Sequence, residues 1–265
     1  MIWLRKLTRR SDGGGYPMSA PVIQRLDALA FTAPVTFLTG ENGCGKTTLI
    51  ELLSELSHAI RIDGNAAPGE KQQMIRGATP HFRVEMARRP ARCFYFHAEG
   101  FIRYTDEVYA MRAEAQRDLD DLYENQRYGS DYARSLASQP YAGALDQMRR
   151  MYEHDITARS HGESFLDFFG GRLAPNGLYL LDEPEAALSF FNQYVLLNMI
   201  RDAAAQNCQF VISTHSPVLT ALPGADIRQI EDGQISPITY DGLPGVSFLR
   251  DFLTAPQRYL RTREE

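Results

Sequence analysis

The chain lacks the features that mark disulfide-linked, membrane-spanning and strongly charged proteins. Its 265 residues include three cysteines, which lie far apart without a Cys-x-x-Cys pair, so neither a disulfide framework nor a zinc site is expected and a reducing compartment is indicated. No apolar run approaches the roughly 18 residues that a membrane helix needs. The formal net charge of −5 excludes a general attraction of the whole chain to nucleic acid, although it leaves room for a local basic patch.

Internal repeats, low-complexity tracts and sustained heptads are also absent, which argues against a long coiled coil or a repeat protein. The basic residues near the N-terminus are not followed by an apolar stretch, so this end is not expected to be a signal peptide. With 44% hydrophobic residues the chain is long enough to bury a core in one to two domains. We therefore expect a cytoplasmic protein.

Residues 40 to 47 read Gly-Glu-Asn-Gly-Cys-Gly-Lys-Thr and match the phosphate-binding loop G-x-x-x-x-G-K-[ST] in full. A run typical of a buried strand precedes the loop, and apolar residues at helical spacing follow it. The glycines let backbone N–H groups face phosphates, and the positive end of the following helix points to the same place. The motif predicts nucleoside triphosphate binding, with Lys46 on the β- and γ-phosphates and Thr47 on Mg²⁺. The expected nucleotide contacts are Gly40, Asn42, Gly43, Cys44, Gly45, Lys46, Thr47 and Thr48.

Two further motifs follow runs that predict buried strands. The run at 178–181 ends in Asp182 and Glu183, and a parallel strand would bring both carboxylates to the sheet edge where ligands bind. Asp182 is expected to hold Mg²⁺, and Glu183 to polarise the attacking water. The run at 210–213 leads into Ser-Thr-His-Ser-Pro, which contains His215.

These motifs, in this order, resemble the ATP-binding-cassette (ABC) superfamily of ATPases. The resemblance implies that His215 hydrogen-bonds the γ-phosphate and helps to hold the attacking water. The segment Ser-His-Gly-Glu-Ser at 160–164 resembles the family's signature motif, commonly Leu-Ser-Gly-Gly-Gln. Ser160 and Gly162 match its serine and second glycine, which in the family cap the γ-phosphate of a partner subunit. The segment 184–189 resembles the D-loop, which in the family crosses the dimer interface.

The motif wording is most similar to the soluble branch near the chromosome-maintenance, recombination-repair and overcoming-lysogenisation-defect ATPases. The resemblance implies an α/β fold, a P-loop NTPase of the ABC ATPase type, with a central, mostly parallel sheet, an antiparallel β part and a helical subdomain bearing the signature motif. We expect a single domain over 1–265. Residues 1–104 and 170–265 would form the nucleotide-binding core, and about 105–169 the helical subdomain.

Two family positions have no plain counterpart. The Q-loop glutamine is missing, so Glu99 or His97 would have to serve, and we take Glu99 as a candidate metal ligand. The aromatic ring that stacks on adenine would be Trp3, Tyr16 or Phe31, and any of the three could instead be part of the core.

The remaining segments are assigned from periodicity and turn residues. Strands are expected at 2–7, 22–29, 81–86 and 92–97, with a hairpin over 227–238 that turns at Asp232-Gly233. A loop or a short excursion is expected at 63–80. Helices are expected at 105–153 with breaks at Gly129 and Pro140, at 190–205, and at 246–265 with a break at Pro256.

The sequence predicts an ATPase that uses ATP and Mg²⁺ and dimerises head to tail on two ATP molecules. We expect it to act in DNA maintenance, repair or phage defence with a protein partner bound through the helical segment 105–155, and DNA itself remains open as a partner. One alternative is the ATP-binding subunit of a membrane transporter, against which the missing glutamine speaks because it is the usual relay to the membrane subunit. Another is a nucleotide-gated scaffold with little turnover, which the intact Glu183 disfavours.

Overall fold

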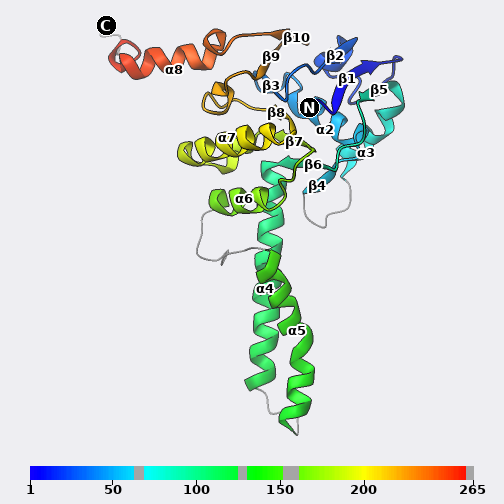
Figure 1. Cartoon of the computed structure of the whole chain (residues 1–265), viewed down its shortest axis with the longest axis vertical. Helices are drawn as coiled ribbons and strands as arrows, with labels where there is room; N and C mark the ends of the chain where they lie inside the picture. The colour runs from blue at the N-terminus through cyan, green and yellow to red at the C-terminus, as the bar shows by residue number, and fades with distance from the viewer. Residues whose placement is uncertain (63–68, 125–129, 152–160, 261–265) are drawn as a thin grey trace.

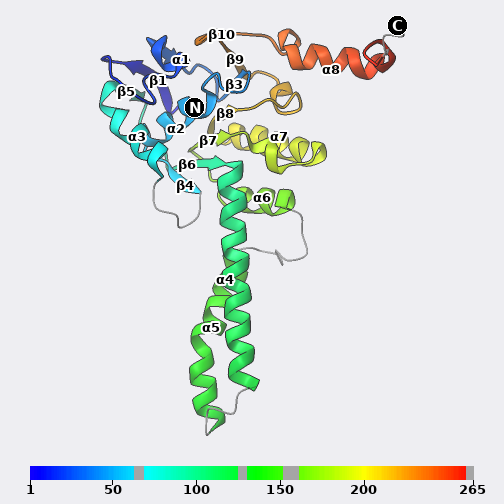
Figure 2. The same ribbon diagram turned by 180° about the vertical axis from the view of Figure 1, so that it is seen from behind.

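The computed structural model describes residues 1–62, 69–124, 130–151 and 161–260. Within these ranges a seven-stranded sheet forms the centre of the molecule, a three-stranded sheet lies beside it, and a pair of long helices projects away from both (Figures 1 and 2). No helix of the described residues is long and apolar enough to cross a membrane.

The large sheet is mostly parallel, as expected. Its strands lie in the order β10 (Gln234–Pro237), β9 (Asp226–Glu231), β3 (Val35–Gly40), β8 (Gln209–Ser213), β7 (Gly177–Asp182), β6 (Arg92–His97) and β4 (Ile60–Ile62). Only the β9–β10 pair is antiparallel among these neighbours. The central strands are buried on both faces, which explains why their sequences are continuous apolar runs and do not alternate.

Successive residues of the central strands enter opposite halves of the core, because side chains alternate across a sheet. One half contains Phe37, Tyr179 and Phe210 and is covered by α6 (His161–Gly170) and α7 (Phe190–Ala205). The other half contains their neighbours Leu38, Leu180 and Val211. It is covered by α2 (Lys46–Leu56) and by the small antiparallel sheet of β2 (Ala28–Ala30), β1 (Leu4–Arg9) and β5 (Phe82–Met86).

A single buried side chain ties the small sheet to the large one. Gln209, at the start of β8, is 0% exposed. Its amide oxygen accepts hydrogen bonds from the backbone N–H groups of Trp3 (2.7 Å) and Leu4 (2.8 Å), and its amide nitrogen donates to the carbonyl of Leu4 (2.9 Å). The glutamine thus pairs three buried backbone groups that have no strand partner on that side.

The helical hairpin consists of α4 (Ala98–Glu124) and α5 (Asp131–Met151) and points away from the sheets (Figures 1 and 2). The expected helix break at Pro140 is wrong, because this residue lies inside α5. Proline removes the N–H that would bond to the carbonyl of Leu136, but both residues are exposed, so water can satisfy that carbonyl. Gly129, the other expected break, lies outside the described residues.

Two further expectations are wrong. The segment 22–29 is not one strand, since α1 (Pro21–Gln24) occupies its beginning and only its end joins β2. The segment 63–80, expected to be a loop or a short excursion, contains α3 (Glu70–Ala78), and its residues 63–68 lie outside the described part. Its Glu, Lys, Gln and Met residues favour a helix, and Ile75 and Ala78 at i, i+3 spacing are buried towards α2. The glycines and prolines of that segment favour a loop, but the burial of Ile75 and Ala78 stabilises the helix.

The other assignments are confirmed within a few residues, including β5, β6 and α7. The β9–β10 hairpin turns at Asp232 and Gly233, whose φ angles of 49° and 78° fit a type I′ turn. The last helix, α8 (Pro244–Thr254), ends before a short 3₁₀ turn at Pro256–Arg258, and residues 261–265 lie outside the described part. The helical part begins at Ala98, earlier than expected; the division at 105–169 stays a prediction.

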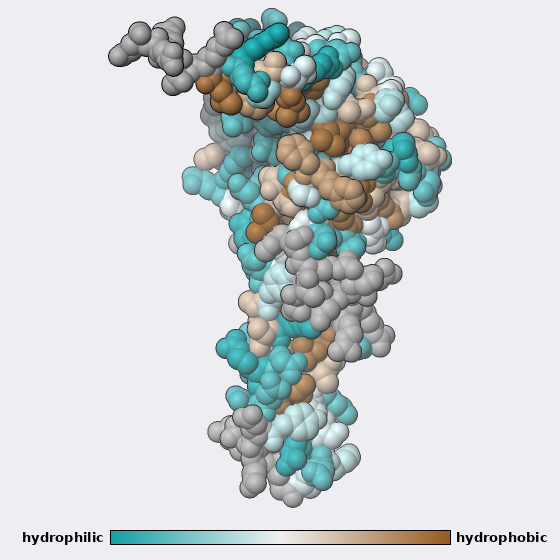
Figure 3. All heavy atoms as spheres, turned by 90° about the vertical axis from the view of Figure 1, so that its left-hand side faces the viewer, coloured by the Kyte–Doolittle hydropathy of each residue, from teal (hydrophilic) through white to brown (hydrophobic). Residues whose placement is uncertain are grey.

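Apolar side chains also reach the surface. Figure 3 shows hydrophobic residues gathered on the upper part of one face, above the hairpin. Several large apolar residues of α7, α8 and the hairpin are exposed, among them Phe190, Phe191, Leu253 and Tyr132.

We expect Gln209→Met to lower the free energy of unfolding by about 3 kcal/mol or more, because two N–H groups and one carbonyl lose their buried partner at about 1–3 kcal/mol each. Urea-induced unfolding followed by circular dichroism measures the loss. Gln206→Met, at an exposed position three residues earlier, should change it by less than about 0.5 kcal/mol. Equal stability of the two variants would show that Gln209 does not join the sheets.

Candidate functional site

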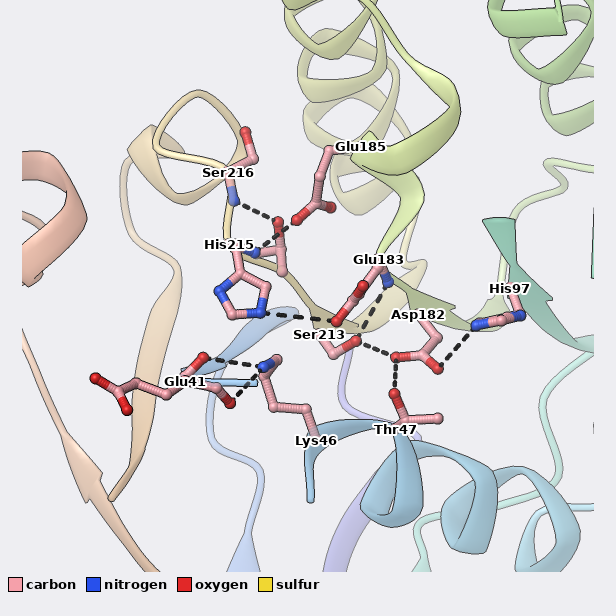
Figure 4. A network of polar contacts seen from close by, with 12 residues as sticks. Glu41, Lys46, Thr47, His97, Asp182, Glu183, Glu185, Ser213, His215 and Ser216 are labelled. Atoms are coloured by element: carbon pink, nitrogen blue, oxygen red, sulfur yellow. Dashed lines mark hydrogen bonds and ion pairs between the residues drawn. The ribbon is translucent and has the colours of Figure 1, made fainter. Parts of the chain in front are cut away.

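The register of the parallel strands lines up the polar residues of the site. His97 pairs with Asp182 across β6 and β7, Asp182 with Ser213 across β7 and β8, and Ser213 with Leu38 across β8 and β3. Because parallel strands end at the same edge, the loop that follows β3 lies beside these side chains (Figure 4).

Glycine is required in the phosphate loop for two distinct reasons. Gly40, Gly43 and Gly45 have φ angles of 145°, 81° and 102°, which other residues rarely adopt. At two of them there is also no room, since a Cβ would lie 2.4 Å from the Ile230 carbonyl oxygen at Gly40 and 2.5 Å from Val22 Cγ1 at Gly45. A Cβ at Gly43 would meet nothing within 4 Å, so this glycine leaves the loop surface open.

Lys46 begins α2 and folds back over the loop, where its Nζ donates to the carbonyls of Gly40 (2.9 Å) and Glu41 (3.0 Å) (Figure 4). Its side chain is buried, so the positive charge is held inside the loop. The N-terminus of α2 adds positive potential at the same point. The next two residues are also engaged: Thr47 donates to Asp182 Oδ1 (3.3 Å), and the Thr48 hydroxyl lies 3.0 Å from that of Tyr16.

Asp182 is completely buried at the end of β7. Its Oδ1 accepts from the hydroxyls of Ser213 and Thr47, whereas its Oδ2 lies 3.7 Å from His97 Nε2 and has no hydrogen-bond partner among the described residues. Burial raises the pKa of this carboxyl group, and the bond from Ser213, the charge of His97 and the bond from Thr47 oppose the rise. A buried carboxylate oxygen without a donor, next to a threonine hydroxyl, fits the oxygen ligands that Mg²⁺ prefers.

Glu183 has a left-handed backbone with φ 48°, a conformation that costs a non-glycine residue about 1–3 kcal/mol and is concentrated at functional sites. Its N–H donates to the carbonyl (3.0 Å) and the hydroxyl (3.2 Å) of Ser213, which hold the residue in this conformation. The carboxylate Oε1 then lies 3.7 Å from His215 Nε2 (Figure 4).

His215 is held from its backbone, since its N–H donates to Glu185 Oε1 at 2.5 Å. Burial and the nearby charge of Lys46 lower the pKa of the imidazole, and Glu183 partly opposes the change. The ring is therefore neutral at pH 7 and has one N–H to donate. Burial also raises the pKa of the Glu185 carboxyl group.

The segment at 160–164 is described in part. Ser160 lies outside the described residues, and α6 begins at His161. Gly162 packs against the segment 184–189, because a Cβ there would lie 2.9 Å from both the Ala187 carbonyl oxygen and Asn192 Nδ2. The start of α6 thus contacts the start of α7, and the contact of Ser160 and Gly162 with a partner's phosphate stays a prediction.

Several expected residues are separated from the site. Glu99 is exposed at the start of α4 and lies along that helix with Ile102 and Arg103, whereas His97 reaches Asp182. The structure therefore favours His97 over Glu99 at this position. Trp3 and Phe31 are buried in the core, which leaves Tyr16, beside Thr48, as the accessible aromatic ring of the three.

Sequence analysis missed Ser213 and Glu185. Ser213 contacts both Asp182 and Glu183, and Glu185 holds His215. Their signal was positional: the first ends the strand next to that of Asp182, and the second follows Glu183 by two residues. In the sequence alone, Ser213 is a strand end and Glu185 is part of the segment that resembles the D-loop.

A cavity of ≈ 560 Å³ adjoins the phosphate loop, within the size range of small-molecule sites. Its lining comes from the loop at 40–44, from Thr214, His215 and Pro217, from the β9–β10 turn and from the start of α8 at 243–246. The cavity therefore reaches the phosphate loop and His215, whereas Asp182 and Glu183 are not part of its lining.

Two family models match parts of the chain: one described as "ABC transporter" over residues 26–150, and one described as "AAA domain, putative AbiEii toxin, Type IV TA system" over residues 116–221. The chain is 31% identical to the hemin import ATP-binding protein HmuV of Burkholderia mallei, over 76% of this chain and 75% of that protein. It is 27% identical to the cobalt import ATP-binding protein CbiO of Salmonella typhimurium, over 86% of this chain and 78% of that protein.

A solved structure of a nucleotide-free ATP-binding cassette from an ABC transporter is also similar, with 17% identity, coverage of 99% of this chain and 100% of that one, and a TM-score of 0.47. Because this TM-score is low, the structural similarity does not identify the family of the chain. The family is identified by the sequence identity to the import ATP-binding proteins, together with the motifs described above.

We expect Asp182→Asn to raise the free energy of unfolding at pH 7. The folded protein binds the Asp182 proton more tightly than the unfolded chain, so folding stability falls as pH rises from about 3.8 through the raised folded pKa. The amide removes this penalty, and the gain should grow from pH 4 to pH 8. Chemical unfolding across that range measures it, with the exposed Asp202→Asn as the control. A gain that does not depend on pH would contradict the burial argument.

Proposed function

Since the chain belongs to the ATP-binding-cassette family of ATPases, we propose that it binds ATP with Mg²⁺ at the phosphate loop and hydrolyses it in a head-to-tail dimer. The observation that carries the proposal is the convergence of Lys46, Asp182, Glu183 and His215 at the carboxyl edge of one sheet (Figure 4). ATP hydrolysis is the activity of this family. The metal ion, the dimer and the role of each residue are our proposal.

The phosphate loop supplies the binding energy. Lys46 exchanges its bonds to two loop carbonyls for the β- and γ-phosphates, and the N–H groups at the start of α2 take up further negative charge. Asn42, Gly43, Cys44, Gly45 and Thr48 belong to the same cradle. Thr47 and Asp182 would hold Mg²⁺, which supplies charge neutralisation at the transferred phosphoryl group.

Glu183 and His215 act on the attacking water. The left-handed backbone of Glu183 carries its carboxylate out of the strand direction, where it can accept a proton from water and orient a lone pair at the γ-phosphate. The neutral imidazole of His215 donates a hydrogen bond to a γ-phosphate oxygen as charge develops there. Their separation of 3.7 Å lets both groups contact one reacting centre.

The second copy would complete each site. We place Ser160, Gly162 and the N-terminus of α6 against the γ-phosphate of the partner, since a helix N-terminus with a serine is suited to an anion. The buried contact of Gly162 with the segment 184–189 supports this arrangement, because it joins the capping helix to the loop that follows Glu183. ATP would then hold two copies together until it is hydrolysed.

In our proposal, the closing and opening of the dimer acts on the membrane subunit of an import system. The relatives HmuV and CbiO are named as import ATP-binding proteins, and their similarity extends over most of this chain. These comparisons support a transporter subunit on the cytoplasmic side of a membrane better than they support a DNA-maintenance role, and they provide no support for DNA as a partner. The α4–α5 hairpin is the surface we assign to partner contact.

A second candidate is an ATPase of phage defence or DNA maintenance with a protein partner. Two observations favour it: the match over residues 116–221 to a domain described as a putative toxin of a toxin–antitoxin system, and His97 in place of the glutamine that relays to a membrane subunit. The similarity to HmuV is more extensive, so we rank this candidate second.

Glu183→Gln should retain ATP binding and lower the hydrolysis rate by about 100-fold or more, because the amide cannot accept the water proton. An ATP-bound dimer should then accumulate, as measured by size-exclusion chromatography with light scattering. Lys46→Ala should instead lose nucleotide affinity, since two phosphate charges lose their cation. Parent-like hydrolysis by Glu183→Gln would rule this residue out as the group that activates water.

A tagged Glu183→Gln chain, loaded with ATP, should capture a multi-spanning membrane protein from detergent-solubilised membranes of the native host. The Lys46→Ala chain serves as the control and should capture less of it, because it cannot reach the ATP-bound state. Capture of a soluble partner alone, or stimulation of the ATPase by DNA, would favour the second candidate and contradict the first.

A further inference from the structure

The first two turns of α7 expose three aromatic side chains on the surface next to the catalytic segment. Phe190 and Phe191 are 70% and 73% exposed, and Tyr194 is also exposed. Tyr194 lies at i, i+4 spacing from Phe190 and at i, i+3 spacing from Phe191, so the three side chains are neighbours on one side of the helix; we call them the aromatic knob. Large exposed aromatic clusters of this kind are typical of interaction surfaces.

The knob is fixed rigidly to the catalytic residues. The Ser189 hydroxyl caps α7 by accepting from the Asn192 N–H (3.2 Å). The buried Gln193 donates to the Leu188 carbonyl (3.1 Å) and accepts from the Ser216 hydroxyl (2.7 Å), one residue after His215. The start of α7, which carries the knob, is therefore held to the segment that follows Glu183 and to the residue that follows His215.

The same chain carries a cavity that the knob does not fill. The ≈ 560 Å³ cavity beside the phosphate loop has apolar lining from Pro21, Ile230, Leu243 and Val246, and no residue of the knob lines it. An aromatic pair is a suitable occupant for such a cavity, since burying phenyl rings is among the largest contributions a side chain makes to an interface.

We propose that the aromatic knob of one copy enters the phosphate-loop cavity of a second copy when the two associate on ATP. This rests on the proposed function. Within one copy, α6 contacts the start of α7 through Gly162, and the cavity adjoins the phosphate loop. If the phosphate loop of one copy faces the start of α6 in the other, we place the cavity of the first beside the knob of the second, because each adjoins one side of that contact. A two-fold axis makes both contacts identical.

The contact adds apolar burial to the dimer interface, beside the contacts made through phosphate. The knob would touch the phosphate loop and the β9–β10 turn of the partner. Because Gln193 bonds Ser216, closure of the dimer at the knob would also affect the position of the segment around His215 in the same copy.

The test uses the Glu183→Gln chain, whose ATP-dependent dimer is measured by analytical ultracentrifugation. Adding Phe190→Ser and Phe191→Ser should raise the dimer dissociation constant about 10-fold or more while ATP affinity of the monomer stays unchanged. Gly245→Leu should also raise the dimer dissociation constant, because it narrows the cavity at a position where a Cβ meets nothing within 4 Å.

Two matched controls should leave the dimer unaffected. Met74→Ser removes an exposed apolar residue of α3, and Gly77→Leu adds a side chain at another glycine whose Cβ meets nothing within 4 Å. Because all of these positions are exposed or open, circular dichroism should show each variant folded.

A photoreactive benzoylphenylalanine in place of Phe191 identifies the occupant. With ATP it should cross-link to a second copy, within residues 229–233 or 243–246. If Glu183→Gln dimerises and the serine variants dimerise equally well, or if the cross-link forms elsewhere or to a different protein, the knob contact is wrong and the proposed function stands. If Glu183→Gln does not dimerise with ATP at all, the head-to-tail dimer is wrong and the knob contact falls with it.

Discussion

The hydroxyl of Ser213 connects the two acidic residues of the site. It donates to Asp182 and accepts from the N–H of Glu183, while the Ser213 carbonyl accepts from the same N–H. The hydroxyl is neutral and donates to Asp182, so it stabilises that carboxylate in its buried position. The bonds from the Glu183 N–H hold Glu183 in a left-handed backbone conformation, which turns its side chain away from the direction of the strand. Both effects depend on the parallel pairing of β7 with β8, which places Asp182 and Ser213 side by side. The site is thus a property of the strand register as much as of the motifs.

Charges in the site are paired within the protein in a way that nucleotide binding must rearrange. Lys46 is satisfied by two carbonyls. Asp182 accepts from two hydroxyls at Oδ1, whereas its Oδ2 lies near His97 without a hydrogen-bond partner among the described residues. The protein therefore tolerates a buried lysine and a buried aspartate near one another without a direct ion pair between them. A strained backbone at Glu183 and a desolvated carboxylate at Asp182 are costs that other parts of the fold offset.

Motifs that depend on order and residue type could be predicted from the sequence. The phosphate loop, the Asp182-Glu183 strand end and the β9–β10 turn each leave a local signature, because each needs particular residues at particular spacings. Features that depend on tertiary packing could not. The burial of Ile75 and Ala78 against α2 makes α3 a helix despite flanking glycine and proline, and solvent access at Pro140 lets α5 continue through a proline. The hydrogen bonds of Gln209 and Ser213 join segments that are remote in the chain, so no local sequence pattern predicts them.

The helix α4 starts at Ala98, immediately after His97, with no intervening loop. Its 27 residues extend for about 40 Å at 1.5 Å per residue, so the base of a stiff rod is joined to a strand end that contacts the buried carboxylate. A rod of that length converts a tilt of about 5° at its base into a displacement of about 3–4 Å at its tip. A small displacement of the strand end near Asp182 would thus become a displacement of several ångströms at the far end of the hairpin.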